Sequence, residues 1–395
     1  MTTAVALRPF AHAWFCYFAA IGAFSLYAPL WFRDQGLSAL AIGSIASLQS
    51  WTRVFAPYGW AWMADHTNQR RALLRLAGVL CVVFALALAL AGRYGVAAVT
   101  FCVVLLFIAN GAVMPLTEAS LAHQLNLASG DGGAGGRYGR TRVWGSVGFM
   151  ASVVLIGMLL HAIGVLAWPW LEVALWLLLA YALWRLPLMS DPLHHDAAPK
   201  GALAVLRQPE VAWFFAGVFL TVLAHVSLYA FFSLFAVSFG MSETAIGLFW
   251  SVGVVVEIVF FWTQGHWFER MSMHNWLLLA AVVSALRFGV MAAFGSFIVV
   301  LVLTQMTHAV TFAAQHAACI TLVARYFPGQ LRGRGQALYT TLGYGLSGVV
   351  GGVAGGGLIE RWGYPAVFWA SSGAALLAAL CLLRSRRHAL RARAG

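Results

Sequence analysis

Charged residues are scarce in this chain of 395 residues, which is 9% charged and 62% hydrophobic. Soluble globular domains carry charges at roughly a quarter of their positions, so this composition excludes an ordinary soluble fold. The net charge of +12 would suggest a nucleic-acid partner in a soluble protein. Here the basic residues fall in short gaps between apolar runs, so membrane topology explains them and no nucleic-acid partner is expected.

Signatures of metal sites, cofactors and catalysis are also missing. The five cysteines lie within or at the ends of apolar runs, and no C-x-x-C spacing occurs. They are expected to be single buried thiols, with no metal site. The sequence has no nucleotide-binding loop and no soluble sensory domain, so we expect no cofactor and no enzyme activity.

Apolar runs long enough to cross a bilayer recur along the whole sequence. Six precede a polar stretch, "MSDPLHHDAAPKGALAVLRQPE", and six follow it. We therefore expect an all-α membrane protein of 12 spans, with an N-terminal half at 1–188, a cytoplasmic linker at 189–208 and a C-terminal half at 209–395. The predicted spans are 10–32, 39–63, 72–92, 96–121, 143–163, 165–187, 209–238, 244–267, 275–294, 296–323, 336–358 and 364–383.

The distribution of arginine and lysine sets the expected orientation. With the N-terminus and the even-numbered gaps on one side, that side holds 19 of the 24 basic residues and the opposite side holds three. The positive-inside rule then places both termini in the cytoplasm. The first apolar run follows Arg8 without a clear cleavage site, so it reads as a retained span.

The two halves also resemble each other. "YGRTRVWGSVGF" begins span five and "RGRGQALYTTLGYGLSG" begins span eleven, six spans later. Both are basic, glycine-containing starts of helices whose small residues allow close packing. Two duplicated six-helix halves are typical of a transporter that rocks around a central site, and a membrane enzyme or receptor would not need the duplication.

The 6+6 pattern resembles the major facilitator superfamily, which carries a signature in the loop between spans two and three. Here "AWMADHTNQRR" retains Asp65, Arg70 and Arg71 as expected gating-loop residues, while His66 and Asn68 replace the basic and glycine positions. The stretches "YGRTRVWGSVGF", "FWSVGVVVEIVFF", "LRFGVMAAF", "LTQMTHAVTFAAQHAA" and "LRGRGQALY" together resemble the phenylpropionate permease family. That family is similar to lactose permease, a proton symporter, and the resemblance covers nearly the whole chain.

Charges inside spans are costly, so they are usually paired and often functional. The resemblance implies that Glu118 on span four and Arg142 at the start of span five hold the substrate, with Arg140 as a loop neighbour. Phe149 falls where the sugar permeases carry a ring-stacking tryptophan. The alternative is a structural ion pair, or surface charges at the membrane edge.

Three further residues are candidate substrate contacts. Arg53 in span two is either a second contact for an anionic substrate or a structural partner for an acid such as Glu118. His225 and Tyr229 lie one turn apart on span seven and share a helix face. They either line the cavity or pack in the core.

Glu257, Arg287 and His308 on spans eight, nine and ten form the expected proton-coupling group, as the resemblance implies. A nearby arginine changes how readily a buried carboxylate holds a proton, which is why such a pair suits a symporter. The sugar permease has His-x-x-Glu on span ten, whereas here Thr311 stands at the glutamate position. The proton must therefore be carried elsewhere, with Glu257 and Glu118 as candidates.

These observations predict a proton-coupled importer of a small aromatic carboxylate such as 3-phenylpropionate, working by alternating access in a bacterial inner membrane. Its expected partners are the small-molecule substrate, protons and the bilayer, and a monomer is the family expectation. Three alternatives stay open: a sugar or nucleoside proton symporter, an efflux antiporter, and a membrane sensor that transports nothing.

Overall fold

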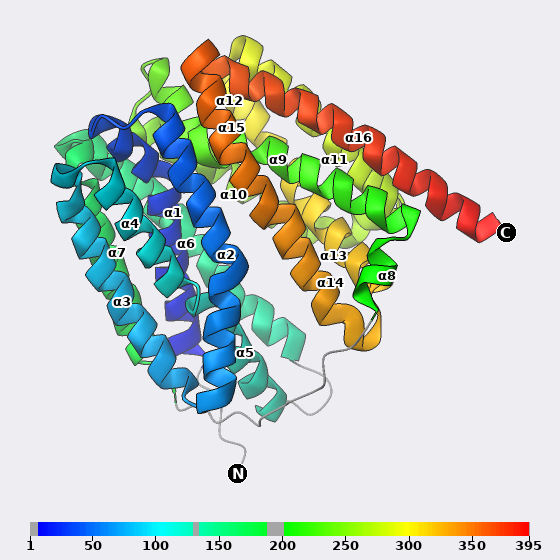
Figure 1. The fold of residues 1–395 in the computed structure, drawn as a ribbon, viewed down its shortest axis with the longest axis horizontal. Helices are drawn as coiled ribbons and strands as arrows, with labels where there is room; N and C mark the ends of the chain where they lie inside the picture. Colours follow the sequence, from blue (N-terminus) through cyan, green and yellow to red (C-terminus); the bar gives the residue numbers. More distant parts are fainter. Residues whose placement is uncertain (1–6, 129–133, 188–200, 395) are drawn as a thin grey trace. The chain divides into compact units, whose positions relative to one another are not determined.

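The computed structural model describes residues 7–128, 134–187 and 201–394, and every regular element in these ranges is a helix (Figure 1). Among these residues, 11 helical stretches of 20 residues or more are long and apolar enough to cross a membrane. About 20 apolar residues suffice for a span, so the chain is an all-helical, multi-pass membrane protein.

The helix α2 (Ala39–Thr67) covers the predicted span 39–63 but is not among the 11. Its 29 residues correspond to a length of about 43 Å, which is enough for a crossing. A crossing at this position, and with it a total of 12 spans, stays a prediction.

The chain forms two compact units, which are described separately. The first contains residues 1–37, 51–195 and 242–248, of which 1–6, 129–133 and 188–195 lie outside the described residues. Besides most of α2, its helices are α1 (Arg8–Asp34), α3 (Arg70–Ala91), η1 (Gly92–Tyr94), α4 (Val96–Asn110), α5 (Val113–Ala128), α6 (Ala134–Ile163), η2 (Val165–Ala167) and α7 (Trp168–Trp184).

Local sequence explains several helix boundaries in this unit. Prolines occupy the first turns of α1 and α7, where a missing N–H removes no helical hydrogen bond. Gly164 follows α6 with φ +89°, a left-handed conformation that glycine adopts without strain. The predicted span 96–121 is interrupted between α4 and α5.

Aromatic packing holds α7 against α1. Trp168 is fully buried, and its indole N–H donates to the Ala23 carbonyl at 3.3 Å. Its ring centroid lies 5.5 Å from those of both Phe24 and Trp31. Between spans this packing stabilises the fold through van der Waals contact, because the surrounding lipid is itself apolar.

The second unit contains residues 38–50, 196–241 and 249–395, of which 196–200 and 395 lie outside the described residues. It includes the start of α2 and most of α10 (Glu243–Phe268). Its other elements are α8 (Ala202–Leu206), α9 (Pro209–Ser238), α11 (Met273–Phe294), α12 (Ile298–Met306), η3 (Ala309–Ala314), α13 (Gln315–Tyr326), η4 (Gly329–Leu331), α14 (Arg332–Leu338), η5 (Tyr339–Gly345), α15 (Leu346–Trp362) and α16 (Tyr364–Ala394).

Small residues bring the start of α2 against α15 within this unit. The Ser47 hydroxyl donates to the Val349 carbonyl at 2.6 Å and accepts from the Val353 amide at 3.0 Å. A Cβ added to Gly352 would overlap the Gly43 carbonyl, so this backbone approach requires glycine. The buried serine hydroxyl therefore joins the two helices through main-chain atoms.

Most of the predicted linker, 189–200, lies outside the described residues, and α8 occupies part of 201–208. The linker and the division into 1–188 and 209–395 remain predictions. Helix α16 continues to Ala394, well past the predicted end of span twelve at 383, and carries basic residues of the C-terminal tail.

Candidate substrate and proton sites

In the first unit, Arg142 lies on the face of α6 that packs against α1. Its guanidinium carbon is 4.2 Å from the centroid of the Phe18 ring and 5.2 Å from that of the Trp14 ring. Stacking of this kind uses the face of the guanidinium and leaves its N–H groups, which lie in the plane, available to a ligand. Arg140, two residues earlier, is exposed.

Glycine spacing makes this contact possible. A Cβ on Gly145 would come 2.6 Å from the Phe18 ring and 2.7 Å from the Arg142 guanidinium. A Cβ on Gly148 would overlap the Phe15 carbonyl oxygen. The glycines of "RVWGSVGF" therefore let α6 approach α1 closely enough for Arg142 to reach the two aromatic rings.

Glu118 on α5 is half-buried and accepts a hydrogen bond from the Tyr138 hydroxyl at 3.2 Å. No ion pair joins Glu118 to Arg142 among the described residues, although both charges act electrostatically on Tyr138. The two predicted substrate residues thus lie near one phenol rather than in a direct salt bridge.

Arg53 belongs to the same neighbourhood. Both Arg53 and Arg142 act electrostatically on the buried Tyr17 hydroxyl. Arg53 is exposed although it lies near the middle of α2. An arginine at such a depth is stable when it faces water or a polar group.

Phe149 is half-buried and turned toward α1. Its ring lies 3.0 Å from the position that a Cβ on Gly22 would occupy. The side chain therefore fills a space left by a glycine, and part of it remains accessible.

In the second unit, Arg287 on α11 is 2% exposed and makes three hydrogen bonds to uncharged partners. It donates to Thr311 at 2.9 Å and to Gln305 at 2.9 Å, and it lies 3.2 Å from His308 Nδ1. Among the described residues, no carboxylate comes within 4 Å of this guanidinium. A buried cation held only by neutral groups is costly, which makes the place a functional candidate.

Glu257 on α10 reaches this cation through the histidine. Its carboxylate oxygen lies 3.8 Å from His308 Nε2, while His308 Nδ1 faces Arg287. Because Arg287 can only donate, the contact requires an unprotonated, accepting Nδ1. The three predicted proton-coupling residues are therefore placed in one chain, Glu257 to His308 to Arg287.

His225 and Tyr229 on α9 lie beside this chain. Buried His225 packs on Phe288 and bonds through Nδ1 to the Thr221 carbonyl oxygen at 2.8 Å. Tyr229 is 37% exposed and packs on Trp250, and its hydroxyl interacts electrostatically with Arg287. Tyr229 is thus open to a ligand, whereas His225 is a core side chain next to the charge.

Two π-helical segments interrupt the helices of this unit, η3 at Ala309–Ala314 and η5 at Tyr339–Gly345. Wider turns of this kind often occur at functional sites. Thr311 belongs to η3 and hydrogen-bonds Arg287. The residue that replaces the expected glutamate of span ten is therefore a direct neighbour of the buried arginine.

The predicted gating-loop residues lie where α2 turns into α3. Arg70 and Asp65 form an ion pair at 3.7 Å, with the Asp65 side chain 57% exposed. Asn68 has a φ of +51° and is the only described non-glycine residue in the left-handed region. Asparagine tolerates this conformation better than most residues, so it can replace the family's glycine without losing the turn.

We expect Asn68→Gly to leave stability unchanged within about 0.5 kcal/mol and Asn68→Val to lower it by about 1–2 kcal/mol. A β-branched side chain is strained at this φ, whereas glycine is not. Thermal unfolding of the two purified variants measures the difference. Equal unfolding midpoints for the valine and glycine variants would contradict this account of the turn.

Sequence reasoning missed several of these neighbours. Tyr17 and Asn110 lie in the neighbourhood of Arg53 and Arg142, and Tyr138 contacts Glu118. Gln305 hydrogen-bonds Arg287. Asn110 and Gln305 could have been found, because a side-chain amide within an apolar span needs a partner. The tyrosines carried no such signal.

Buried charges on helices long enough to span a membrane are typical of membrane transporters. The sequence model of the MFS_1 like family matches residues 8–370, so the chain belongs to this family of the major facilitator superfamily. This confirms the superfamily resemblance predicted from the sequence.

Two curated relatives are similar over nearly their whole length. The "Probable 3-phenylpropionic acid transporter" of Escherichia coli K12 is 28% identical, covering 93% of this chain and 95% of the relative. The "Maltose permease" of Geobacillus stearothermophilus is 29% identical, covering 94% and 92%.

Solved structures support the fold. The nucleoside transporter NupG matches with a TM-score of 0.80 at 16% identity, over 96% of this chain and 99% of that one. A peptide transporter POT in complex with sulfate matches with a TM-score of 0.75 at 14% identity, over 95% and 93%.

Proposed function

We propose that this transporter imports a small aromatic carboxylate, of which 3-phenylpropionate is the example, together with a proton, by alternating access. The observation that carries the proposal is the charge that acts on Tyr17 and Tyr138. Two guanidiniums, Arg53 and Arg142, act electrostatically on the Tyr17 hydroxyl, while Arg142 and one carboxylate, Glu118, act on that of Tyr138. The excess of one positive charge suits an anionic ligand.

The surrounding groups also suit an aromatic ring. Arg142 lies on Phe18 and Trp14, so a carboxylate bound to its N–H edge would bring an attached ring close to these side chains. Arginine binds carboxylates through two parallel hydrogen bonds, and aromatic pairs add roughly 0.5–1.5 kcal/mol. Phe149, farther along α6, offers a further apolar surface.

For the coupled proton we propose the chain of Glu257, His308 and Arg287. The charge of Arg287 favours an ionised carboxylate when the two are close and favours it less when they separate. His308 lies between them, so a small shift of α10 against α11 changes how strongly Glu257 holds a proton. Thr311 and Gln305 keep Arg287 hydrogen-bonded in either case.

We further propose that the carrier is a monomer with 12 spans, including α2, and that both termini lie in the cytoplasm. The similarity to transporters of bacteria supports an inner-membrane location. The 19 basic residues on one predicted side support the orientation.

A sugar or nucleoside symporter is the second candidate. Glu118 accepts a hydrogen bond from a tyrosine rather than from arginine, and a carboxylate with a remaining lone pair can bind a sugar hydroxyl. The similarity to a maltose permease is as high as that to the phenylpropionic acid transporter.

Ligand-dependent thermal stabilisation of the purified protein separates these candidates. We expect 3-phenylpropionate to raise the unfolding midpoint, and we expect the uncharged analogue 3-phenylpropanol to need at least about tenfold higher concentration, because only the acid satisfies the arginines. Maltose and uridine serve as the competing ligands. Stabilisation by maltose or uridine, without any by the acid, would transfer the proposal to the second candidate.

A further inference from the structure

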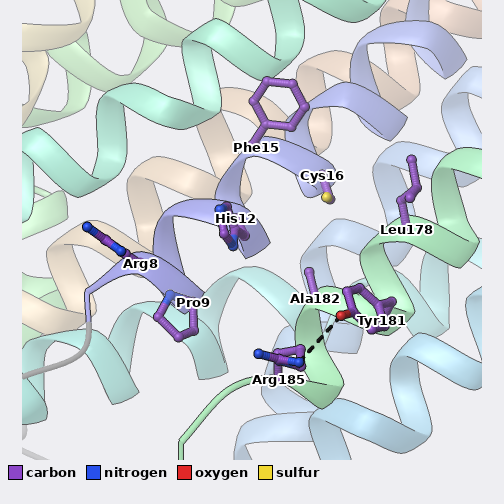
Figure 2. A pocket seen from close by; sticks show the side chains of 9 residues that line it. All are labelled: Arg8, Pro9, His12, Phe15, Cys16, Leu178, Tyr181, Ala182 and Arg185. Atoms are coloured by element: carbon purple, nitrogen blue, oxygen red, sulfur yellow. Dashed lines mark hydrogen bonds between the residues drawn. The ribbon is translucent and has the colours of Figure 1, made fainter.

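A cavity of about 460 Å³ lies between the start of α1 and the end of α7, within the first unit (Figure 2). Arg8 stands in the first turn of α1, and Arg185 directly follows the last turn of α7. Since both helices are long enough to span a membrane, the cavity lies at the level where a bilayer changes from acyl chains to headgroups. None of the residues assigned to substrate or proton above lines it.

One end of the cavity is basic. Arg8, His12 and Arg185 are exposed and line it, and Arg185 donates a hydrogen bond to the Tyr181 hydroxyl at 3.5 Å. The first acidic residue of α1 after Arg8 is Asp34, at the far end of the helix. In the described part of the chain, neither Arg8 nor Arg185 has a carboxylate within 4 Å, so the cavity presents uncompensated positive charge.

The other end is apolar. Phe15, Cys16 and Leu178 line the part of the cavity farther along both helices. Figure 2 shows Phe15 and Cys16 toward one end of the view and Arg185 at the other. The separation of Arg8 from Cys16 corresponds to about 12 Å along α1. The cavity therefore has a charged mouth and an apolar wall running into the depth of the membrane.

We propose that this cavity binds an anionic phospholipid. The phosphate lies between the arginines at the mouth, and the start of one acyl chain lies along Phe15 and Leu178. Basic pockets between spans at headgroup level bind such lipids through the same two interactions. A free phosphate would use the arginines but would leave the apolar wall without an occupant, so the full length of the cavity favours a lipid.

Native mass spectrometry of the full-length protein, titrated with dioleoyl phosphatidylglycerol in detergent, tests the proposal. We expect one tightly retained lipid per wild-type molecule. Arg8→Gln and Arg185→Gln should each weaken it about fivefold, and the double variant roughly 30-fold, since each basic residue contributes a similar electrostatic attraction. Arg387→Gln, at an exposed site on α16, removes the same charge outside the cavity and should have no effect.

Competing ligands and a protection assay separate the sources of the phosphate. Phosphatidylcholine, which is zwitterionic, should be retained much less, and inorganic phosphate should not displace phosphatidylglycerol. In nanodiscs, phosphatidylglycerol should slow alkylation of Cys16 relative to phosphatidylcholine, with Cys102 and Cys381 in the same molecule unchanged.

Equal lipid retention by the Arg8→Gln/Arg185→Gln and Arg387→Gln proteins would overturn the proposal. Displacement of the lipid by millimolar inorganic phosphate would overturn it as well, because the site would then recognise a free anion. Circular dichroism and unfolding midpoints establish that the variants are folded. Both arginines are exposed at helix ends, so their replacement leaves the buried core intact.

Discussion

Arg142→Gln is expected to reduce counterflow of 3-phenylpropionate by about 100-fold, while Arg140→Gln stays within about twofold of the wild type. The two arginines stand two residues apart in the same stretch of α6. Arg142 lies on Phe18 and Trp14 beside the Tyr138 hydroxyl, whereas Arg140 is exposed. Removing a charged partner from a desolvated contact costs about 2–5 kcal/mol, and 100-fold corresponds to about 2.7 kcal/mol.

Proteoliposomes with matched protein content provide the measurement, since exchange of labelled for unlabelled substrate needs no proton gradient. Arg140→Gln is the matched control, because it removes the same charge from the same helix. Equal activity of the two variants would return Arg142 to a structural role. Loss of activity in both would point to the basic character of the segment rather than to one contact.

Glu257→Gln is expected to abolish the response to a proton gradient and to leave exchange intact. One pH unit supplies about 1.36 kcal/mol per proton, so it can drive wild-type uptake by up to about tenfold. Glutamine cannot release a proton, so the stimulation should fall to about one. Counterflow should remain within about twofold, because exchange moves no net proton.

The matched control is Glu269→Gln, which removes an exposed acid just beyond the end of the same helix. It should retain both the stimulation and the exchange. A Glu257→Gln protein that still responds tenfold to the gradient would exclude this carboxylate as the proton carrier. Glu118 would then be the candidate carrier. Loss of exchange along with stimulation would instead indicate damage to binding or to folding.

Much of the fold could be predicted because it depends on patterns that the sequence displays directly. Apolar runs predicted the spans, and 11 of the helices have the length and composition to cross a membrane. The interruption between α4 and α5 and the two π-helical segments could not be predicted in this way. Hydropathy does not show contacts such as the hydrogen bond from Arg287 to Thr311, which lies in one of these segments.

The residues of the candidate sites could be predicted in the same way, whereas their contacts could not. Charges within spans are rare, so Arg53, Glu118, Arg142, Glu257 and Arg287 could be selected from the sequence alone. The contacts that these side chains make could not be predicted from the sequence. Glu118 contacts Tyr138 and not Arg142, and Glu257 lies next to His308 and not against Arg287. Such choices depend on helix rotation, which a one-dimensional pattern does not contain.

In the loop between α2 and α3, the residue at the turn differs from the one in the family signature. The glycine of the family signature is absent, and the motif alone would be weak evidence for the superfamily. Asn68 adopts φ +51° at this position, a left-handed conformation that asparagine tolerates better than most residues. Asparagine and glycine both tolerate a left-handed conformation, so the chain can turn at this position with either residue.

Initial uptake of labelled 3-phenylpropionate by wild-type proteoliposomes at an external pH of about 8, with and without an inward proton gradient, tests the central claim most directly. At that pH only about 0.02% of a carboxylic acid with an ordinary pKa is neutral, so passive entry is slow, and protein-free liposomes measure what remains. The account predicts saturable uptake well above the liposome background, stimulated by the gradient and absent in Arg142→Gln. Uptake equal to that of protein-free liposomes, by a folded protein that takes up maltose, would contradict it.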